Sequence, residues 1–341
     1  MTSGYKSVMT ITRKASAVAA VASLGVATAL LTGGGASAAT AIPGCAPVGN
    51  VEAIIDDSGS MSINDPNKLR RAGLELFISS TANAKKTLGA VEFGDAPAQT
   101  VFAPAPIGPN VKPMIAALQA KIQADNGGTD YDSGFQKAKG DNPGAQARIF
   151  LTDGANNGEF FNSHLPGPKT YVVGLGIGPA SPTDADATRL QQIATDTGGQ
   201  YFPSVDKADL QPTFNQISSA VSCLQAPRSF KSRLFTKKGQ SSAAAAGLGK
   251  STKKVELVLN WAEPTNKFSL SSVQALGRKN KVLASLTGKG KPKKLSFKKT
   301  RGTTFQSLSV KKPKGTRKLR FKVKAGQVLK AESTVSQLTQ R

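Results

Sequence analysis

The stretch VEAIIDDSGSM, residues 51–61, is a largely apolar run that ends in a cluster of oxygen-bearing side chains. Its first five residues are typical of a buried β-strand, and Asp56, Asp57, Ser58 and Ser60 follow closely. Two interpretations are open at this point. The Asp and Ser residues could form a turn and cap the next helix. Alternatively, the alternating spacing of Asp56, Ser58 and Ser60 could direct three hard oxygen ligands at one metal ion.

Short apolar runs alternate with amphipathic stretches from residue 51 to residue 221. The expected strands are 51–55, 87–93, 98–103, 147–152, 170–178 and 200–205, and the expected helices are 66–84, 111–124, 186–199 and 207–221. Such alternation predicts an α/β fold, with a doubly wound, mostly parallel sheet and helices on both faces. Ligands of such sheets bind beyond the carboxyl ends of the strands. Asp56 and Asp153 are both expected at those ends.

Charge is distributed very unevenly along the 341 residues. Residues 39–224 contain 13 Lys and Arg against 18 Asp and Glu, whereas residues 225–341 contain 29 Lys and Arg against 3 Glu. Two regions that differ so much in charge are expected to be two domains with different partners. The predicted boundaries are 39–224 for the first domain, 225–252 for a low-complexity linker that includes GQSSAAAAGLG, and 253–341 for the second domain.

The second domain follows a different pattern, with apolar residues at every second position. Leu319, Phe321 and Val323, for example, alternate with basic residues. Several short runs of this kind predict a small basic all-β domain, an antiparallel sandwich or barrel. Lysines can protect sheet edges from aggregation, but a charge excess of 26 is more than that protection requires. The excess indicates an anionic polymer or lipid as partner. Specific nucleic-acid binding is not expected, because aromatic residues are few and most occupy the expected core face.

The N-terminus carries the features of a secretory signal peptide. Basic residues precede an apolar run, which is followed by small residues spaced as in an A-x-A cleavage site. These features are Lys6, Arg13 and Lys14, the run 15–31, and Ala36 and Ala38. An uncleaved membrane anchor is the alternative, but the run is at the short limit for spanning a bilayer. We therefore expect residues 1–38 to be a signal peptide and the mature protein to be secreted, extracellular or associated with the cell surface.

The chain contains two cysteines, Cys45 and Cys223. An exported chain folds in an oxidising compartment, where an even number of cysteines usually pairs. We therefore expect a Cys45–Cys223 disulfide. Lipidation of Cys45 is an alternative, but the cysteine lies far beyond the apolar run of the signal peptide.

Six segments of the acidic region resemble, in order and spacing, the motifs of von Willebrand factor type A domains. They are VEAIIDDSGSM, GAVEFGDAPAQTVF, NGGTDYDSGF, RIFLTDGANN, YVVGLGIG and LQQIATDTGGQYF. The resemblance covers about residues 51–224 and implies a Rossmann-like fold with a metal-ion-dependent adhesion site. All five ligand positions of that site are matched without substitution. They are Asp56, Ser58, Ser60, Thr129 and Asp153.

The resemblance also implies how the site would work. An all-oxygen ligand set suits Mg²⁺, with Mn²⁺ or Ca²⁺ as alternatives, and suits zinc or copper poorly. In that family one coordination position stays open, and a carboxylate from a partner protein commonly fills it. Cysteines that flank the domain are also familiar there, in agreement with a Cys45–Cys223 pair.

Catalysis is the competing class of function. The only histidine, His164, lies in NSHLPGP without a G-x-S-x-G elbow, and we expect it to be a solvated loop residue. Gly174, Gly176 and Gly178 lack the G-x-G-x-x-G spacing of nucleotide sites. We therefore expect no enzyme, but an exported metal-dependent adhesion or protein-binding module with a basic domain that associates with anionic surfaces. The alternatives are an envelope structural or assembly factor and, last, a metal-dependent hydrolase.

Overall fold

The computed structural model describes most of the chain beyond the N-terminal segment. The described residues are 45–340, except 81, 95–96, 125–126, 155, 158–162, 178, 181–183, 205–208, 225–227, 262, 264, 287–292 and 303. The expected signal peptide, residues 1–38, and Gly178 lie outside them. Within the described residues, no helix is both long and apolar enough to cross a membrane.

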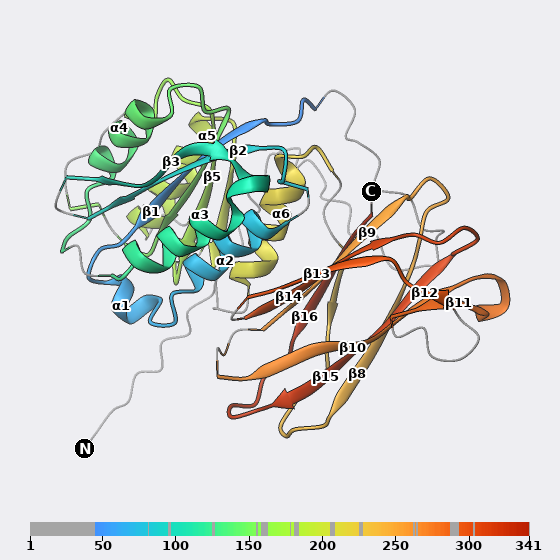
Figure 1. Cartoon of the computed structure of the whole chain (residues 1–341). Coiled ribbons are helices and arrows are strands. Elements are labelled where there is room, and N and C mark those ends of the chain that lie inside the picture. Colours follow the sequence, from blue (N-terminus) through green and yellow to red (C-terminus); the bar gives the residue numbers. More distant parts are fainter. Residues whose placement is uncertain are drawn as a thin grey trace, which may run out of the picture. The chain divides into compact units, whose positions relative to one another are not determined.

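A six-stranded sheet with helices on both faces forms the first part of the fold (Figure 1). The strand order is β3-β2-β1-β4-β5-β6, and every pair is parallel except β2 with β3. The strands are β1 (Asn50–Asp56), β2 (Thr87–Phe93), β3 (Gln99–Pro106), β4 (Ala147–Thr152), β5 (Lys169–Leu175) and β6 (Gln200–Ser204). The helices are α1 (Met61–Asn64), α2 (Leu69–Ser79), α3 (Ile107–Lys121), α4 (Tyr131–Asp141), α5 (Ala185–Asp196) and α6 (Leu210–Ala220). The predicted doubly wound, mostly parallel α/β fold is confirmed.

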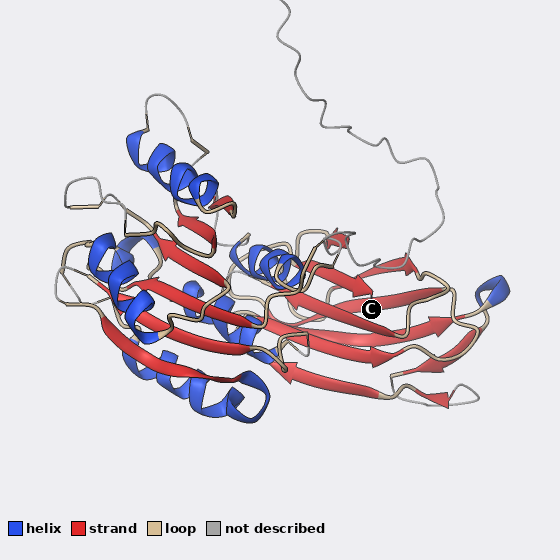
Figure 2. Cartoon of the chain, turned by 90° about the horizontal axis from the view of Figure 1, so that it is seen from above, coloured by secondary structure: helices blue, strands red, loops and turns tan. Residues whose placement is uncertain are grey.

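Two apolar clusters, one on each face, hold the helices to this sheet. On one face Ile55 of β1 belongs to a cluster with Phe77 of α2 and Phe214 of α6, together with residues of α3. On the other face Ile54 belongs to a cluster with Phe135 of α4 and residues of α5. Successive strand residues point to opposite faces, so a strand covered on both sides needs a continuous apolar run. Figure 2 shows the same helix layers from above.

Two five-stranded sheets form the basic all-β part of the chain, in the orders β12-β11-β10-β15-β8 and β13-β14-β9-β16-β7. The strands are β7 (Arg228–Lys231), β8 (Ser241–Gly247), β9 (Lys254–Asn260), β10 (Lys267–Leu276), β11 (Val282–Ser285), β12 (Lys293–Lys294), β13 (Phe297–Arg301), β14 (Phe305–Lys311), β15 (Lys318–Gln327) and β16 (Val335–Gln340). A 3-10 turn, η1 (Arg278–Asn280), lies between β10 and β11. Apolar residues of both sheets form one core, among them Leu257 of β9 and Phe321 of β15. The predicted all-β sandwich is confirmed.

Two β-strands lie in the segment 225–252, which was expected to be a low-complexity linker. It contains β7, which pairs with β16, and β8, which pairs with β15 along its whole length. The sequence of β8, SSAAAAG, shows no apolar face because its residues are small. Ala246 is nevertheless buried in the core beside the larger side chains of the neighbouring strands. The all-β part therefore begins at β7.

The central strands β14, β9 and β16 of the sheet β13-β14-β9-β16-β7 are buried on both faces. Val258 of β9 and Phe305 of β14 form a small buried cluster with Leu76 of α2. Beside them Glu256 is only 4% exposed and accepts a hydrogen bond from Ser80 Oγ at 3.3 Å. Nearly every residue of β9, β14 and β16 is buried, on both faces of the sheet. Among the described residues of this sheet, exposure is therefore concentrated on the edge strands β7 and β13.

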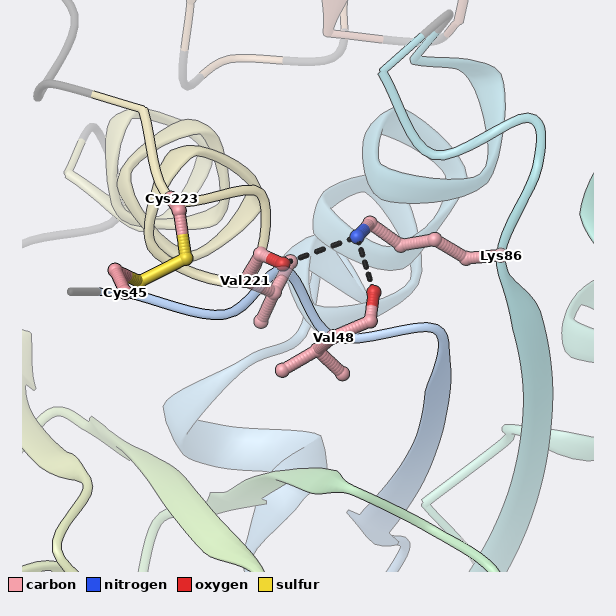
Figure 3. Close-up of a disulfide and its surroundings, with 5 residues drawn as sticks. All are labelled: Cys45, Val48, Lys86, Val221 and Cys223. Atoms are coloured by element: carbon pink, nitrogen blue, oxygen red, sulfur yellow. Dashed lines mark hydrogen bonds between the residues drawn. A yellow bond between two sulfur atoms is a disulfide. The ribbon is translucent and has the colours of Figure 1, made fainter. Parts of the chain in front are cut away.

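The expected disulfide between Cys45 and Cys223 is present, with Cα atoms 5.6 Å apart (Figure 3). It joins the segment before β1 to the end of α6. Lys86 reinforces the same junction, because its Nζ donates to the carbonyl oxygens of Val48 at 2.5 Å and Val221 at 3.0 Å. The disulfide closes a loop with a sequence separation of 178 residues. In the chain-entropy model, a loop of this size stabilises the fold by up to about 5 kcal/mol.

Glu52, in the middle of β1, is a fully buried carboxyl group. Its Oε2 accepts a hydrogen bond from Asn142 Nδ2 at 2.9 Å, whereas Oε1 has no partner among the described residues. Burial raises the pKa of Glu52 to about 8, against the opposing effects of the Asn142 hydrogen bond and the Arg148 charge. The carboxyl group is therefore mostly protonated at neutral pH.

Replacing Glu52 by Gln should change how the stability depends on pH. The folded-state pKa lies above the unfolded-state value, so the folded wild type holds an extra proton between about pH 4.5 and about pH 8. Its stability is then highest in acid and falls as the pH rises through that range. The Glu52→Gln variant lacks this group, so its free energy of unfolding relative to wild type should increase between about pH 5 and pH 9. Urea unfolding across this range measures the difference, and a constant value would contradict the protonated state.

Candidate metal centre

The carboxyl ends of β1 and β4 bring two carboxylates side by side. The two strands are adjacent and parallel, with Ile55 paired to Leu151. Asp56, the last residue of β1, is therefore level with Thr152, and Thr152 Oγ1 donates a hydrogen bond to Asp56 Oδ2 at 2.6 Å. Asp153 follows directly in the chain. The register of one strand pair thus places both predicted acidic ligands at the same edge of the sheet.

A chain of hydrogen bonds links the loop after β1 to Asp153. Ser58 N donates to Asp56 Oδ1 at 2.9 Å, and the hydroxyl oxygens of Ser58 and Ser60 are 3.1 Å apart. Ser60 Oγ then donates to Asp153 Oδ1 at 2.9 Å. The other oxygen of Asp153 accepts from Asn64 Nδ2 at 3.0 Å. Four of the five predicted ligands therefore belong to one continuous network.

Thr129 reaches the same place from a third segment of the chain. It lines a hollow of about 380 Å³ together with Ser60 and Asp153. The segment before it is held against the first loop, because Gly59 N donates to Gly127 O at 2.7 Å. Gly127 has a φ of 64°, in the left-handed region that glycine adopts without strain. The structure thus brings all five predicted residues together.

Three polar residues at the site were missed by sequence reasoning. Asn64 lies on the short helix α1, which the sequence pattern does not predict, and it orients Asp153. Thr152 holds Asp56. Asn157 accepts a hydrogen bond from Thr129 N through its side chain, and its own N donates to Thr129 O at 2.8 Å. For Asn157, the pair of asparagines in LTDGANN was the available sequence signal.

The electrostatics of the cluster favour a bound cation. Asp56 is 0% exposed, and burial raises its pKa to about 6; hydrogen bonds from Ser58 and Thr152 oppose this shift, and the charge of Asp153 adds to it. Two adjacent carboxylates, one of them fully buried, are costly to keep ionised without a positive charge between them.

The donor set fits a hard divalent cation. Its five side chains offer only carboxylate and hydroxyl oxygens, the atoms that Mg²⁺, Mn²⁺ and Ca²⁺ prefer. Across the described ranges, no group of three or more His, Cys, Asp or Glu residues could hold a metal ion. The cluster is therefore poor in charge and rich in hydroxyl groups, which matches the ligand set expected from the sequence.

The cluster meets solvent at Ser60. Asp56, Ser58, Thr129 and Asp153 are at most 6% exposed, whereas Ser60 is exposed. A cation held there would be shielded by the sheet from below and reached from solvent across Ser60. This is the arrangement that a ligand-binding metal requires.

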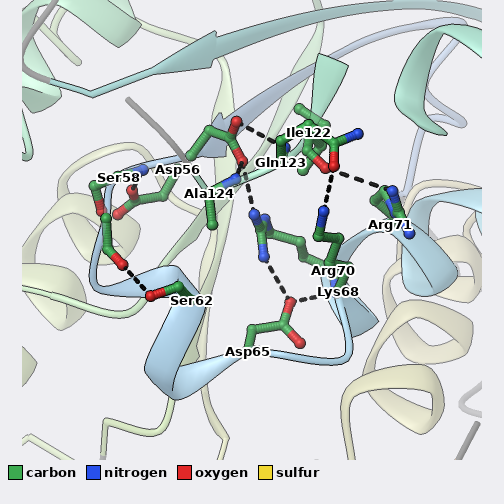
Figure 4. A network of polar contacts seen from close by, with 12 residues as sticks. Asp56, Ser58, Ser62, Asp65, Lys68, Arg70, Arg71, Ile122, Gln123 and Ala124 are labelled. Carbon is green, nitrogen blue, oxygen red and sulfur yellow. Dashed lines mark hydrogen bonds and ion pairs between the residues drawn. The ribbon is translucent and has the colours of Figure 1, made fainter. Parts of the chain in front are cut away.

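A buried arginine ties together the segments that carry the site (Figure 4). Arg70, at the start of α2, is 0% exposed and lies 2.7 Å from Asp57 Oδ1 and 3.0 Å from Asp65 Oδ2. Asp57 also accepts hydrogen bonds from Gln123 N at 2.9 Å and Ala124 N at 2.7 Å. One ion-paired group thus fixes the loop after β1, the start of α2 and the end of the α3 segment relative to one another. The sequence pattern gave no sign of this role.

His164 is not the solvated loop residue that the sequence predicts. It is 1% exposed, and its Nε2 lies 3.5 Å from Asp196 Oδ2 at the end of α5. Its ring packs against Phe135 of α4, with centroids 6.1 Å apart. The ring of His164 is therefore held between α4 and α5. His164 belongs neither to the hydrogen-bond network of the cluster nor to the lining of its hollow.

Comparisons with known proteins find no matching family model and no matching curated protein. Solved structures do resemble the chain. A von Willebrand factor type A protein from Catenulispora acidiphila is 17% identical with a TM-score of 0.42, over 87% of this chain and 63% of that one. The PilB minor pilin from Streptococcus sanguinis is 14% identical with a TM-score of 0.41, over 53% of this chain and 63% of that one.

Proximal thread matrix protein 1 from the mussel byssus, with a zinc-occupied MIDAS motif, is 18% identical with a TM-score of 0.40, over 55% of this chain and 50% of that one. The chain spans less than two thirds of the length of each of these three structures. We draw no conclusion about a ligand or a partner from likenesses at these levels.

Removing the charge of Arg70 should weaken divalent-cation binding as well as the fold. The Arg70→Met variant leaves two buried carboxylates without their cation, which should lower the free energy of unfolding by roughly 3–5 kcal/mol. The loop after β1 then loses its anchor, so the affinity for Mg²⁺ should fall even where the variant is fully folded. Isothermal calorimetry well below the unfolding temperature measures this affinity.

Leu190→Ala is the matched control. Leu190 lies on α5, is 0% exposed and is remote from the ion pair, and its truncation should cost a similar roughly 2–5 kcal/mol. Cation affinity should be unchanged in this variant. Equal affinities in Arg70→Met, Leu190→Ala and wild type would contradict the positioning role of Arg70.

Proposed function

We propose that the chain is a binding module, not an enzyme, and that its α/β part binds a protein ligand through a divalent cation. Asp56, Ser58, Ser60, Thr129 and Asp153 would hold the cation. When bound, it supplies a positive charge that an acidic group of the ligand can approach. The observation that supports this most is the hydrogen-bonded chain from Asp56 through the two serines to Asp153.

The surroundings of the cluster suit a macromolecular ligand. The hollow opens toward solvent and is lined by three glycines, whose missing side chains let another chain approach closely. They are Gly127, Gly128 and Gly154. A carboxylate is a preferred ligand of hard cations, so an exposed Asp or Glu of a partner protein fits the open side. Mg²⁺ is the proposed ion, with Mn²⁺ or Ca²⁺ as alternatives.

The hydrogen bonds of the two carboxylates favour binding over hydrolysis. Both oxygens of Asp56 accept hydrogen bonds, from Ser58 N and Thr152 Oγ1. Both oxygens of Asp153 also accept hydrogen bonds, from Ser60 and Asn64. Neither group points freely at a substrate position as a general acid or base must. The two carboxylates are held as ligands are held.

The all-β part is proposed to attach the module to an anionic surface. Residues 225–341 contain 29 Lys and Arg but only 3 Glu. All three glutamates are engaged: Glu256 with Ser80, Glu263 with Lys330 at 2.9 Å, and Glu332 with Asn266. Most of the positive charge is thus left for a partner. An exported adhesion protein at a cell surface would use both parts of the chain.

Replacing Asp56 or Asp153 by Ala should abolish measurable Mg²⁺ and Mn²⁺ binding, because each change removes a charged oxygen from the same small cluster. Calorimetry on folded protein measures the affinity. Asp132→Ala, a change of equal charge on the first turn of α4, is the control and should bind like wild type. Unchanged affinity in both the Asp56→Ala and the Asp153→Ala variants would overturn the site.

The protein-binding half of the proposal has its own test. Immobilised wild-type chain should retain proteins from a preparation of surface proteins in Mg²⁺ and release them to a chelator. The Asp153→Ala variant should retain none of the chelator-released set, and Asp132→Ala should retain all of it. Retention that is the same with and without chelator, and the same in wild type and the Asp153→Ala variant, would contradict a metal-dependent contact.

A further inference from the structure

One face of the sheet β12-β11-β10-β15-β8 carries a row of cations on the interior strand β15, between β10 and β8. Strand β15 alternates buried and exposed residues along its length. Its exposed residues include Lys318, Arg320, Lys322 and Lys324, and we call these four residues the basic row. None of them forms an ion pair among the residues that the structure describes. Alternate strand residues lie about 6.7 Å apart, so the charges form one straight file.

The residues on both sides of the basic row are small or uncharged. On β8, Gly247, Ala245, Ala243 and Ser241 pair with the four cations in turn. On β10, Leu276, Gln274, Ser272 and Ser269 occupy the corresponding places. The basic side chains therefore project beyond the small side chains of β8, and neither β8 nor β10 places an acidic group opposite them. An extended chain can lie along them without a steric barrier.

Protection of a sheet edge does not explain this row. Lysines serve that purpose on edge strands, where backbone groups are unpaired. Strand β15 is hydrogen-bonded to β10 on one side and to β8 on the other, so it has no open edge. Like charges closer than the Debye length of about 8 Å repel one another. The row therefore destabilises the free protein, and a bound polyanion would relieve that repulsion.

We infer that the basic row binds an extended polymer with one phosphodiester group per short repeat, such as a polyol phosphate. The inference rests on the proposed association of the all-β part with anionic surfaces and names its site and ligand class. A single file of charges fits a single extended chain better than a planar membrane. Lys as a point charge and Arg as a planar fork both bind phosphate oxygens well.

The same face lacks what other polyanion surfaces would use. Phe321 and Phe268, the aromatic residues of β15 and β10, are 2% and 0% exposed, so bases of single-stranded nucleic acid would have nothing to stack on. The large apolar side chains that the described structure exposes are Ile63, Leu165, Leu234 and Leu329. None belongs to β8, β10 or β15, so the face offers no anchor for insertion between lipids.

The test compares two variants of the full mature chain that carry the same net charge. In the row variant, Lys318, Arg320, Lys322 and Lys324 are all replaced by Gln. In the matched control, four exposed lysines of the other sheet are replaced by Gln. They are Lys231, Lys298, Lys299 and Lys311. All eight side chains are exposed, so both variants should fold, and circular dichroism with thermal unfolding verifies this.

Binding to poly(glycerol phosphate) is measured by calorimetry at several salt concentrations. The row variant should bind roughly a thousandfold more weakly than wild type, since each of the four basic side chains near an anionic polymer contributes on the order of 1 kcal/mol. The slope of log affinity against log salt should also fall in magnitude by about 3, because each of the four lost phosphate contacts contributes roughly 0.7 to that slope. The control variant should retain most of the affinity.

Other outcomes overturn the inference in distinguishable ways. Equal weakening in both variants would show that the positive charge acts as a whole, which leaves the anionic-surface proposal standing but removes the row as its site. Stronger binding to phosphatidylglycerol vesicles, a carboxylated polysaccharide or a single-stranded oligonucleotide would replace the ligand class. No salt-sensitive binding of wild-type chain to any of these probes would overturn both the site and the anionic-surface proposal.

Discussion

The parallel pairing of β1 with β4 is the constraint on which the candidate site depends. It sets Asp56 level with Thr152, whose hydroxyl group holds Asp56 Oδ2 at 2.6 Å, and it places Asp153 one residue beyond. A shift of one residue in this register would turn one of the two carboxylates to the other face of the sheet. The apolar clusters on both faces fix the register, because the apolar residues of both strands already have places in them. The packing of the core therefore also determines the geometry of the site.

Charge near the site is stabilised in two different ways. Asp57 is neutralised within the protein by Arg70, and the backbone amides of Gln123 and Ala124 complete its hydrogen bonds. Asp56, the preceding residue, has hydrogen bonds but forms no ion pair with a cationic side chain in the part of the chain that the structure describes, and burial raises its pKa to about 6. Arg70 balances the charge of Asp57, whereas the charge of Asp56 would be balanced by a bound cation. This contrast between adjacent residues supports the proposal of a metal site.

The sequence predicted the α/β strands well, and it named five candidate ligands that the structure brings together, because both leave short-range signals. Continuous apolar runs mark strands buried on two faces. The five candidate ligands lie in short motifs, of which those with Asp56 and Asp153 follow strands and the one with Thr129 precedes α4. The prediction failed where a segment is defined by its neighbours. Helix α4, with the sequence YDSGFQKAKGD, has two glycines and low intrinsic helix propensity, yet it forms against Phe93 and Phe150. Strand β8 was not predicted because its sequence is a run of small residues. The large side chains beside it belong to the neighbouring strand β15. The Arg70 ion pairs join residues that no local pattern connects.

Asp56, Ser58, Ser60, Thr129 and Asp153 are proposed to hold one divalent cation. Crystals of the mature chain soaked in Mn²⁺, with data collected at the manganese absorption edge, test this proposal most directly, since the anomalous signal locates the ion without any assumption about ligands. We expect one strong peak in the hollow beside Ser60 and Asp153, within bonding distance of the serine hydroxyl oxygens, and loss of that peak in the Asp153→Ala variant. A well-ordered hollow with no peak, or a peak held by other residues, would contradict the proposal.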